Sequence, residues 1–356
     1  MAGITNAAFR RLCREQGAGL FVSEMVTARA LIERREETFR LIKPGVGESP
    51  RSIQLYAVDP TVLAKAVDLL GSEDLADHID LNFGCPVPKV TRKGGGAALP
   101  FKRNLFREIV KAAVENAKPY GIPVTVKMRI GIDTDHHTYL EAAKSAADLG
   151  VAWVALHART AQQMYEGKAD WSAIKNLVEH LKPTGVPVLG NGDIWSGADG
   201  VEMVRQTGCA GVVVGRGCLG RPWLFADLVD AFNGGDKREL PTLHEVREVM
   251  FRHGELIVDY FESEDRGCRD LRKHMAWYLK GFSVHSELRR QFGMVGSLTE
   301  LRLLLDQLEN QPYPVEIGDK PRGRTSSGRP PTLPDGWLND PDEMITLDVE
   351  DMFSGG

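Results

Sequence analysis

Cys85 and Lys127 are the two residues whose chemistry stands out in this sequence. Cys85 lies in a Gly84–Cys85–Pro86 turn directly after a short apolar run. Most isolated cysteines are inert small hydrophobes, but an unperturbed thiol with a pKa of about 8.5 is mostly protonated at pH 7 and can donate a proton. Lys127 lies within the next apolar run, where an unpaired buried ammonium would cost several kcal/mol. Lys127 therefore needs an anion, either a ligand or the carboxylate of Glu24 or Asp80.

Similar polar residues follow the other β-branched runs of the first 220 residues. A single polar residue at such a position is usually a loop cap, but amide, thiol, ammonium, imidazole and guanidinium groups recur after run upon run. We interpret them as the lining of one pocket. In chain order they are Ser23, Glu24, Gln54, Asn82, Cys85, Lys127, Arg129, His157, Arg159, Asn191, Asp193, Gly215 and Arg216.

The runs that carry these residues alternate with helical segments, which is typical of a parallel sheet with crossover helices. Several are almost continuously apolar, as in strands covered on both faces. With an eighth strand expected just upstream of Met1 and absent from this chain, they predict an α/β (β/α)₈ TIM barrel rather than a doubly wound sheet. The seven runs are Gly19–Val26, Arg51–Ala57, His78–Gly84, Pro123–Ile130, Ala152–Ala158, Pro187–Ile194 and Gly211–Gly217.

In such a barrel the carboxyl ends of the strands meet at one mouth, and the last two loops usually hold a phosphate. These loops here contain Gly190–Asp193 and Gly215–Gly217, whose glycines let backbone N–H groups approach an anion. Lys127 would point from the middle of the barrel toward the same mouth. Flavin mononucleotide (FMN) fits the whole set. Its phosphate would lie on the glycine loops, its pyrimidine edge on Gln54 and Lys127, and its reduced-state charge near Lys127 and His157.

Composition limits the alternatives. Hydrophobic residues make up 42% of the chain and charged residues 26%, as in soluble globular proteins. No run approaches the roughly 18 apolar residues of a membrane span. Five widely spaced cysteines without a CxxC pair argue against disulfides and thiolate zinc sites, so we expect no metal and a cytoplasmic location.

Three regions follow from the pattern of the sequence. Residues 1–229 form the predicted barrel, and 230–310 read as helices alone. Residues 311–356 are rich in proline and acidic residues, which predicts a disordered tail. The formal net charge of -5 resides in this tail, so the rest of the chain is balanced.

Two local clusters of basic residues suggest a polyanionic substrate, although a charged run is usually just a solvated face. In the second cluster, helical spacing would place Leu271, Met275 and Leu279 on the inward face. Arg269, Lys273 and Lys280 would then lie on the outward face. The first cluster contains Lys89, Arg92, Lys93, Lys102, Arg103 and Arg107, and the second Arg266, Arg269, Arg272, Lys273, Lys280, Arg289 and Arg290.

Taken together, these segments resemble the tRNA-dihydrouridine synthases, most closely the bacterial B type, from Met1 to about Leu308. So many motifs in the same order make the resemblance specific. The matching segments are Met1–Phe9, Val22–Met25, Asn82–Val90, Val126–Gly131, His157–Thr160, Gly190–Ile194, Val214–Trp223 and Arg272–Leu279.

The resemblance implies an FMN enzyme that reduces the C5–C6 bond of selected uridines in tRNA with electrons from NADPH. Hydride from flavin N5 would add to C6, and Cys85 would give the proton to C5. Asn82 and Arg159 would seat the uracil or the flavin, and Lys89, Arg92, Arg272 and Lys273 would contact tRNA. We expect a monomer whose helical domain binds the tRNA backbone. The implied FMN contacts are Met1, Ala2, Gln54, Lys127, His157, Asn191, Gly192, Asp193, Gly215 and Arg216.

Two other readings remain open. An FMN barrel acting on a small molecule, such as a dihydroorotate or enoate oxidoreductase, would leave the helical domain and the first basic cluster without a purpose. A non-catalytic RNA-binding protein, disabled by loss of its first strand, would have no need of Cys85, Lys127 and His157. The absent strand also predicts that an upstream-extended chain is more stable, and the tail lies beyond the usual end of the family.

Overall fold

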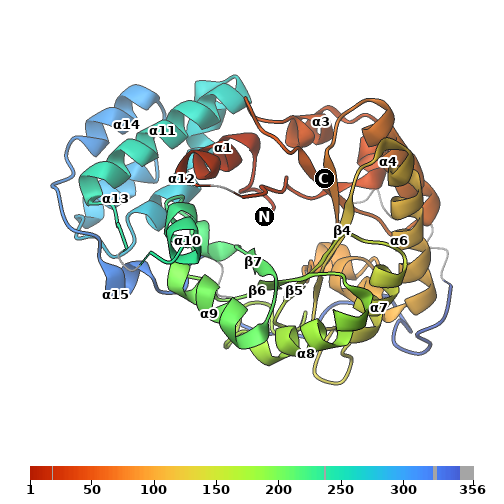
Figure 1. The fold of residues 1–356 in the computed structure, drawn as a ribbon. Helices are drawn as coiled ribbons and strands as arrows, with labels where there is room; N and C mark the ends of the chain where they lie inside the picture. The colour runs from red at the N-terminus through yellow and green to blue at the C-terminus, as the bar shows by residue number, and fades with distance from the viewer. Residues whose placement is uncertain (18, 236–237, 324–326, 345–356) are drawn as a thin grey trace.

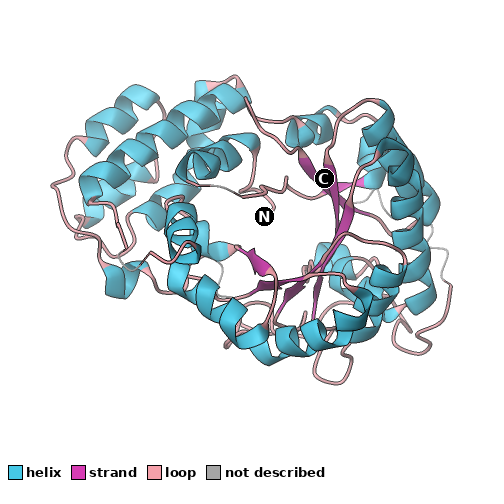
Figure 2. Ribbon diagram, viewed as in Figure 1, coloured by secondary structure: helices cyan, strands magenta, loops and turns pink. Residues whose placement is uncertain are grey.

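Seven parallel strands form one curved sheet in the order β1 to β7, with helices around its outside (Figures 1 and 2). The computed structural model describes residues 1–17, 19–235, 238–323 and 327–344. Six of the seven predicted runs contain a strand, the first run meets β1 only at Val26, and the TIM-barrel-like fold is confirmed. The strands are β1 (Val26–Thr27), β2 (Ser52–Tyr56), β3 (His78–Phe83), β4 (Val124–Arg129), β5 (Val154–His157), β6 (Val188–Asn191) and β7 (Gly211–Val213).

The sheet has one face under the helices and one face inside the barrel, because alternate residues of a strand point to opposite sides. In β4, Val124, Val126 and Met128 are buried in the main hydrophobic core. Thr125 and Arg129 instead form polar contacts with β3 and the turn after it. The covering helices are α4 (Pro60–Ser72), α6 (Arg103–Ala117), α7 (Tyr139–Asp148), α8 (Trp171–Leu181) and α9 (Gly197–Thr207).

Strand β1 is much shorter than the predicted run Gly19–Val26, and the reason is a bulge. Val22 bridges Ser52, but Val26 pairs with Leu55, so the register shifts by one residue between the two points. Within this bulge the hydroxyl of Ser23 accepts the backbone N–H of Gln54 at 3.0 Å, in place of a ladder bond. The neighbouring Glu24 carboxylate accepts the N–H of Gly3.

The helical region packs against one side of the barrel, beside α1 (Ala7–Gln16) and α10 (Leu224–Phe232), as Figure 1 shows. It contains α11 (Leu243–Phe261), α12 (Glu264–Tyr278), α13 (Ser286–Phe292) and α14 (Leu298–Leu305). Leu271, Met275 and Leu279 are buried, as their spacing predicts. Among the described residues, none of the helices is both long enough and apolar enough to span a membrane.

Short helices complete the chain between these elements. They are α2 (Ala28–Ile32), α3 (Glu36–Ile42), α5 (Pro88–Thr91), α15 (Val315–Gly318) and the 3-10 helices η1 (Gly96–Phe101), η2 (Lys118–Tyr120), η3 (Lys182–Thr184) and η4 (Arg216–Cys218).

The expectation of a disordered tail needs correction for its described part. Arg322 is buried and donates to the carbonyl of Leu219, and Trp337 is only 1% exposed. The acidic, proline-rich composition hides these two anchors because their partners lie far away in the sequence. Residues 324–326 and 345–356 of the predicted tail lie outside the described residues.

Candidate active site

The turn that carries Cys85 is held from both sides. Asn82 Oδ1 accepts the backbone N–H groups of Gly84 at 3.1 Å and of Cys85 at 2.9 Å. Arg129 Nε donates to the carbonyl oxygen of Gly84 at 2.9 Å. Burial raises the pKa of the Cys85 thiol, although the Val87 N–H and nearby Arg129 oppose the shift. Cys85 is therefore a protonated thiol at neutral pH, as a proton donor must be, and not a thiolate.

A chain of polar contacts inside the barrel supports this turn. Asn82 Nδ2 donates to Gln54 Oε1 at 2.9 Å, and Gln54 Nε2 donates to Asp80 Oδ2 at 2.7 Å. The other Asp80 oxygen accepts the hydroxyl of Thr125 at 2.7 Å. Because each group has a defined donor and acceptor role, the side chains of Asn82 and Gln54 are fixed in one orientation.

His78 continues this chain toward the bottom of the barrel. Since the Thr125 hydroxyl donates to Asp80, His78 Nε2 must donate to Thr125 Oγ1 at 3.0 Å, and Nδ1 must accept the hydroxyl of Ser52 at 2.7 Å. Burial lowers the pKa of His78 to about 4. The imidazole is thus neutral, which matches its roles as one donor and one acceptor.

Lys127 lies beside Asn82 in the strand register, and its ammonium has no hydrogen-bond acceptor among the described residues. Burial lowers the pKa of its ammonium to about 8, with a further contribution from Arg129. The alternative of an ion pair with Glu24 or Asp80 is not realised, since no described carboxylate lies within 4.0 Å of Lys127 Nζ. Lys127 is half-buried, and a partly desolvated ammonium without a carboxylate partner favours an anionic ligand.

His157 follows Arg129 in the register and precedes Asn191. Burial lowers its pKa well below the ordinary value, and the charges of Arg129, Lys127, Arg159 and Arg216 lower it further. The imidazole of His157 is therefore neutral in the ligand-free protein and can exchange a hydrogen bond. Its predicted role in offsetting the charge of a reduced flavin stays a prediction.

The first glycine loop is braced from behind. Arg159 Nη2 and the backbone N–H of Ala169 both donate to Asp193 Oδ2 at 2.7 Å. Trp171 Nε1 donates to the carbonyl of Gly192 at 3.0 Å. Asp193 adopts a φ of 56°, a left-handed conformation that these contacts hold in place.

The other sides of these loops remain available to a ligand. In the described chain, the backbone N–H groups of Gly192, Asp193 and Gly215 have no hydrogen-bond acceptor, and neither has the buried Nη1 of Arg159. A Cβ on Gly215 would meet nothing closer than 4.0 Å, so its backbone can be approached closely. At Gly190 a glycine is needed for packing instead, because a Cβ at this position would lie 2.4 Å from Met203 Sδ. The loops thus form an anion cradle in which only some glycines face the ligand.

Two aromatic side chains that the sequence did not single out flank Arg216. Its guanidinium carbon lies 4.4 Å from the ring centre of Tyr165 and 5.3 Å from that of Trp195, and it contacts Asp193 at 3.6 Å. A cavity of about 700 Å³ opens beside them. In the sequence, these two aromatic residues could have been found because they lie in the loops after His157 and Asp193.

The N-terminal segment also reaches the mouth, near the centre of the ring in Figure 1. The Met1 ammonium donates to Thr5 Oγ1 at 2.7 Å. Burial lowers the pKa of this ammonium, and its electrostatic neighbours include Glu24 and Lys127. Met1 thus lies with the predicted FMN residues, and Ala2 beside it is exposed. Asn191 is buried, and its Nδ2 donates to the carbonyl oxygen of Val213 at 2.7 Å.

The predicted substrate residues fall into two groups. Lys89 and Arg92 are exposed on and directly after α5, immediately beyond the Cys85 turn. The side chains of Asn82 and Arg159 are largely occupied within the protein, since Arg159 also donates to the carbonyls of Glu166 and Gly167. Their contact with a uracil or a flavin stays a prediction.

The two basic clusters are less open than the sequence suggests. Lys102 is fully buried, and Arg103 is paired with Glu141. In the second cluster Arg272 donates to the carbonyl of Val295 at 2.9 Å, and Lys280 to those of Lys320 and Pro321. Basic side chains that donate to backbone carbonyls stabilise the fold and are less available to a polyanion. The predicted outward row of basic residues therefore holds for Arg269 and only in part for Lys273 and Lys280.

Comparisons with known proteins show the family of this chain. The sequence model of the family "Dihydrouridine synthase (Dus)" matches residues 1–313. A "Probable tRNA-dihydrouridine synthase" from Mycobacterium tuberculosis (strain H37Rv) is 54% identical over all of this chain and 93% of its own length. A "tRNA-dihydrouridine synthase B" from Vibrio parahaemolyticus is 37% identical over 83% of this chain and 89% of its own length.

A solved structure, histamine dehydrogenase from Rhizobium sp. 4-9, superposes with a TM-score of 0.51 at 14% identity, over 86% of this chain and 60% of that chain. At that identity the likeness supports the barrel fold alone. The described residues contain no group of three or more His, Cys, Asp or Glu placed to hold a metal ion. With its family match over nearly the whole barrel and helical region, the chain belongs to the dihydrouridine synthase family.

Proposed function

We propose that this enzyme reduces the C5–C6 double bond of uridines in tRNA, with FMN as its bound cofactor, NADPH as the electron source and Cys85 as the proton donor. One observation carries the proposal. A thiol kept protonated by desolvation lies at the same barrel mouth as a half-buried ammonium without a partner among the described residues, and as an anion cradle. The names of the relatives support tRNA as the substrate.

The residues at the mouth fit FMN. Its phosphate would be held by the N–H groups of Gly192, Asp193 and Gly215, with Arg216 and the unpartnered Nη1 of Arg159 nearby. Met1, Ala2, Gln54, Lys127, His157 and Asn191 complete the set that we assign to the cofactor. Lys127 would balance negative charge on the flavin ring, and the flavin would in turn provide the anionic partner of the Lys127 ammonium.

When bound, FMN supplies hydride to C6 of the uracil ring. Reduction at C6 leaves negative charge conjugated to the C4 carbonyl, and C5 then takes a proton from Cys85. Asn82 and Arg129 hold the Cys85 turn in place, so the thiol need not search for its position. The raised pKa of Cys85 keeps the proton on sulfur until this step.

The target base must leave its stack to reach a mouth of this kind, which is easiest in single-stranded or splayed parts of a folded RNA. Exposed Lys89 and Arg92 lie next to the Cys85 turn and would meet the tRNA backbone there. Arg272 and Lys273 on α12 would extend the contact to the helical region. We expect the protein to act as a cytoplasmic monomer.

A single-turnover experiment tests this function. The purified protein is loaded with FMN, reduced without oxygen by a stoichiometric amount of NADPH, and mixed with unmodified tRNA transcript. The proposal expects the oxidised flavin absorbance to return only when tRNA is added. Reoxidation by free uridine or by orotate at the same rate as by tRNA would favour a small-molecule enzyme instead.

A further inference from the structure

The chain segment 327–344, called the strap below, packs against the mouth loops although its composition predicts disorder. Its anchor is Trp337, which is 1% exposed and lies with Ala98 and Ile132 in a small hydrophobic cluster. The indole Nε1 donates to the carbonyl of Ala98 at 3.1 Å. The ring fits against Gly94 so closely that a Cβ at that position would lie 2.3 Å from Trp337 Cη2.

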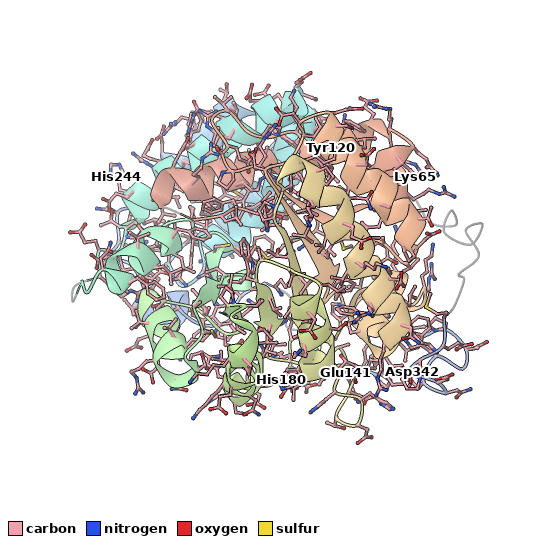
Figure 3. All side chains as sticks on the ribbon, turned by 45° about the vertical axis from the view of Figure 1, so that its right-hand side comes forward. Lys65, Tyr120, Glu141, His180, His244 and Asp342 are labelled. Atoms are coloured by element: carbon pink, nitrogen blue, oxygen red, sulfur yellow. The ribbon has the colours of Figure 1, made fainter. Side chains whose placement is uncertain are left out.

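The end of the strap covers the start of α6. Lys102 Nζ donates to the carbonyl of Asp340 at 2.7 Å and to Glu343 Oε2 at 2.8 Å, and it lies 5.2 Å from the Trp337 ring centre. The N–H of Arg103, at the first turn of α6, donates to the carbonyl of Pro341 at 2.8 Å. Figure 3 shows Asp342 of the strap beside Glu141, on this side of the molecule.

The beginning of the strap contacts a second mouth loop. Arg329 donates its N–H to the carbonyl of Gln162 at 2.9 Å, and Gly328 donates to the carboxylate of Glu166. The carbonyl of Glu166 in turn accepts Nε of Arg159, which braces Asp193. The strap therefore connects the loop after β3 with the loop after β5.

Only one loop segment separates Trp337 from Cys85. The N–H of Ala97 donates to the carbonyl of Cys85 at 3.0 Å. Gly96 lies so close that a Cβ there would be 2.4 Å from the Cys85 oxygen and 3.1 Å from its Cβ. Thus the loop 94–98 lies between Trp337 on one side and the carbonyl and Cβ of Cys85 on the other, so a displacement of the loop would reach the residue that carries the thiol.

We propose that the strap is a clamp built onto the family's core and that Trp337 is a positioning residue for Cys85. The matched family region ends at residue 313, before the strap begins. The catalytic consequence rests on the proposed function, because positioning matters only if Cys85 donates its proton. The clamp itself is a statement about the loop and can be tested without tRNA.

Thiol reactivity tests the clamp. Cys13, Cys209, Cys218 and Cys268 are buried, so a small alkylating reagent such as iodoacetamide reports on Cys85, with the modified peptide identified by mass spectrometry. We expect W337A to raise the alkylation rate of Cys85 at least tenfold. W337F keeps an aromatic ring against Gly94 and should stay within about 1.5-fold of the wild type, and M344A, at an exposed strap position, should not change the rate.

Turnover separates positioning from general stability. In W337A we expect kcat for tRNA reduction to fall at least tenfold with KM unchanged within twofold, and W337F to restore most of it. E343A removes an exposed partner of Lys102 and leaves the fold intact, so it should raise the alkylation rate about threefold even if W337A fails to fold.

Wild-type alkylation rates in both E343A and folded W337A would overturn the clamp, as would unchanged rates in E343A alone if W337A unfolds. A wild-type protein that never reduces tRNA would contradict the proposed function, while the alkylation rates would still decide whether the clamp exists.

Discussion

The amide oxygen of Asn82 lies 2.9 Å from the backbone nitrogen of Cys85, and the amide nitrogen of the same side chain lies 2.9 Å from Gln54 Oε1. One side chain thus links the turn that carries the thiol to the polar chain inside the barrel. Because Gln54 is itself fixed by Asp80, the position of Cys85 depends on residues of two neighbouring strands.

The two sides of the Asn82 amide can be tested separately. N82A removes both contacts, and we expect a loss of about 1–3 kcal/mol in the free energy of unfolding and a tenfold or greater loss of kcat. N82D keeps the oxygen that accepts the Cys85 N–H but places a second oxygen against Gln54 Oε1, so stability should fall while the turn keeps its cap. Chemical denaturation and tRNA reduction assays give both quantities. Equal kcat in N82A and wild type would show that the cap is dispensable.

Flavin affinity should depend on pH through Lys127. The pKa of this ammonium in the ligand-free protein is lowered to about 8, so its charge is present below pH 8 and is lost as the pH rises above it. FMN affinity should fall above pH 8, by at most about tenfold per unit. K127M should bind FMN at least tenfold more weakly at pH 7 and show no such decline. Quenching of FMN fluorescence between pH 6.5 and 9.5 measures both, and parallel curves for the two proteins would exclude Lys127 from the anion site.

Two buried histidines at the junction of α11 and α12 predict acid sensitivity. His253 and His274 are fully buried with ring centres 4.5 Å apart, and neither nitrogen of His274 has a hydrogen-bond partner in the described chain. Burial lowers the pKa of His253 to about 3 and that of His274 well below its ordinary value.

The unfolded chain protonates these histidines near pH 6.5, whereas the folded protein keeps them neutral. Stability is therefore complete above pH 6.5 and falls below it, by about 1.4 kcal/mol per pH unit for each histidine. H274F should reduce the slope of the unfolding free energy against pH by the amount that one histidine contributes. Denaturant titrations at pH 5, 6 and 7.5 measure it, and identical slopes would mean that His274 is not neutral in the fold.

tRNA affinity should depend on the exposed cations next to Cys85. K89E combined with R92E should weaken tRNA binding at least tenfold and lower the slope of log affinity against log salt by about 1 to 2, since each phosphate contact contributes somewhat less than one. K65E combined with K118E is the matched control, because both lysines are exposed and the change in net charge is the same; Lys65 lies on the outer face of α4 (Figure 3). Equal losses in both proteins would indicate a general charge effect rather than a binding surface.

The strands were predictable because buried parallel strands are continuous apolar runs, and six of the seven begin and end within a few residues of the prediction. β1 was overestimated because the hydroxyl of Ser23 replaces a ladder bond inside a bulge, and no periodicity signals such a replacement. Register then explains why polar residues at successive strand ends, such as Asn82 and Lys127, lie side by side.

The partners of these residues were not predictable. That Asn82 caps the Cys85 turn, or that Arg159 braces Asp193, depends on side-chain geometry that neighbours in sequence do not determine. The strap is the clearest case, because Trp337 and Gly94 are far apart in the chain and each is unremarkable alone. Composition averages a tail over many residues, whereas the described part of this tail is anchored locally by buried Trp337 and by the contact of Glu343 with buried Lys102.

The central claim is that Cys85 protonates a tRNA uracil reduced at this mouth, and mass spectrometry of the RNA tests it most directly. Unmodified tRNA transcript is incubated with NADPH and FMN-loaded protein, either wild type or C85A, with C268A as the control for loss of a thiol elsewhere. We expect wild type and C268A to make a uridine heavier by two hydrogens, and C85A to retain FMN and bind tRNA but react about 10² to 10⁴ times more slowly. Undiminished product formation by C85A would contradict the account.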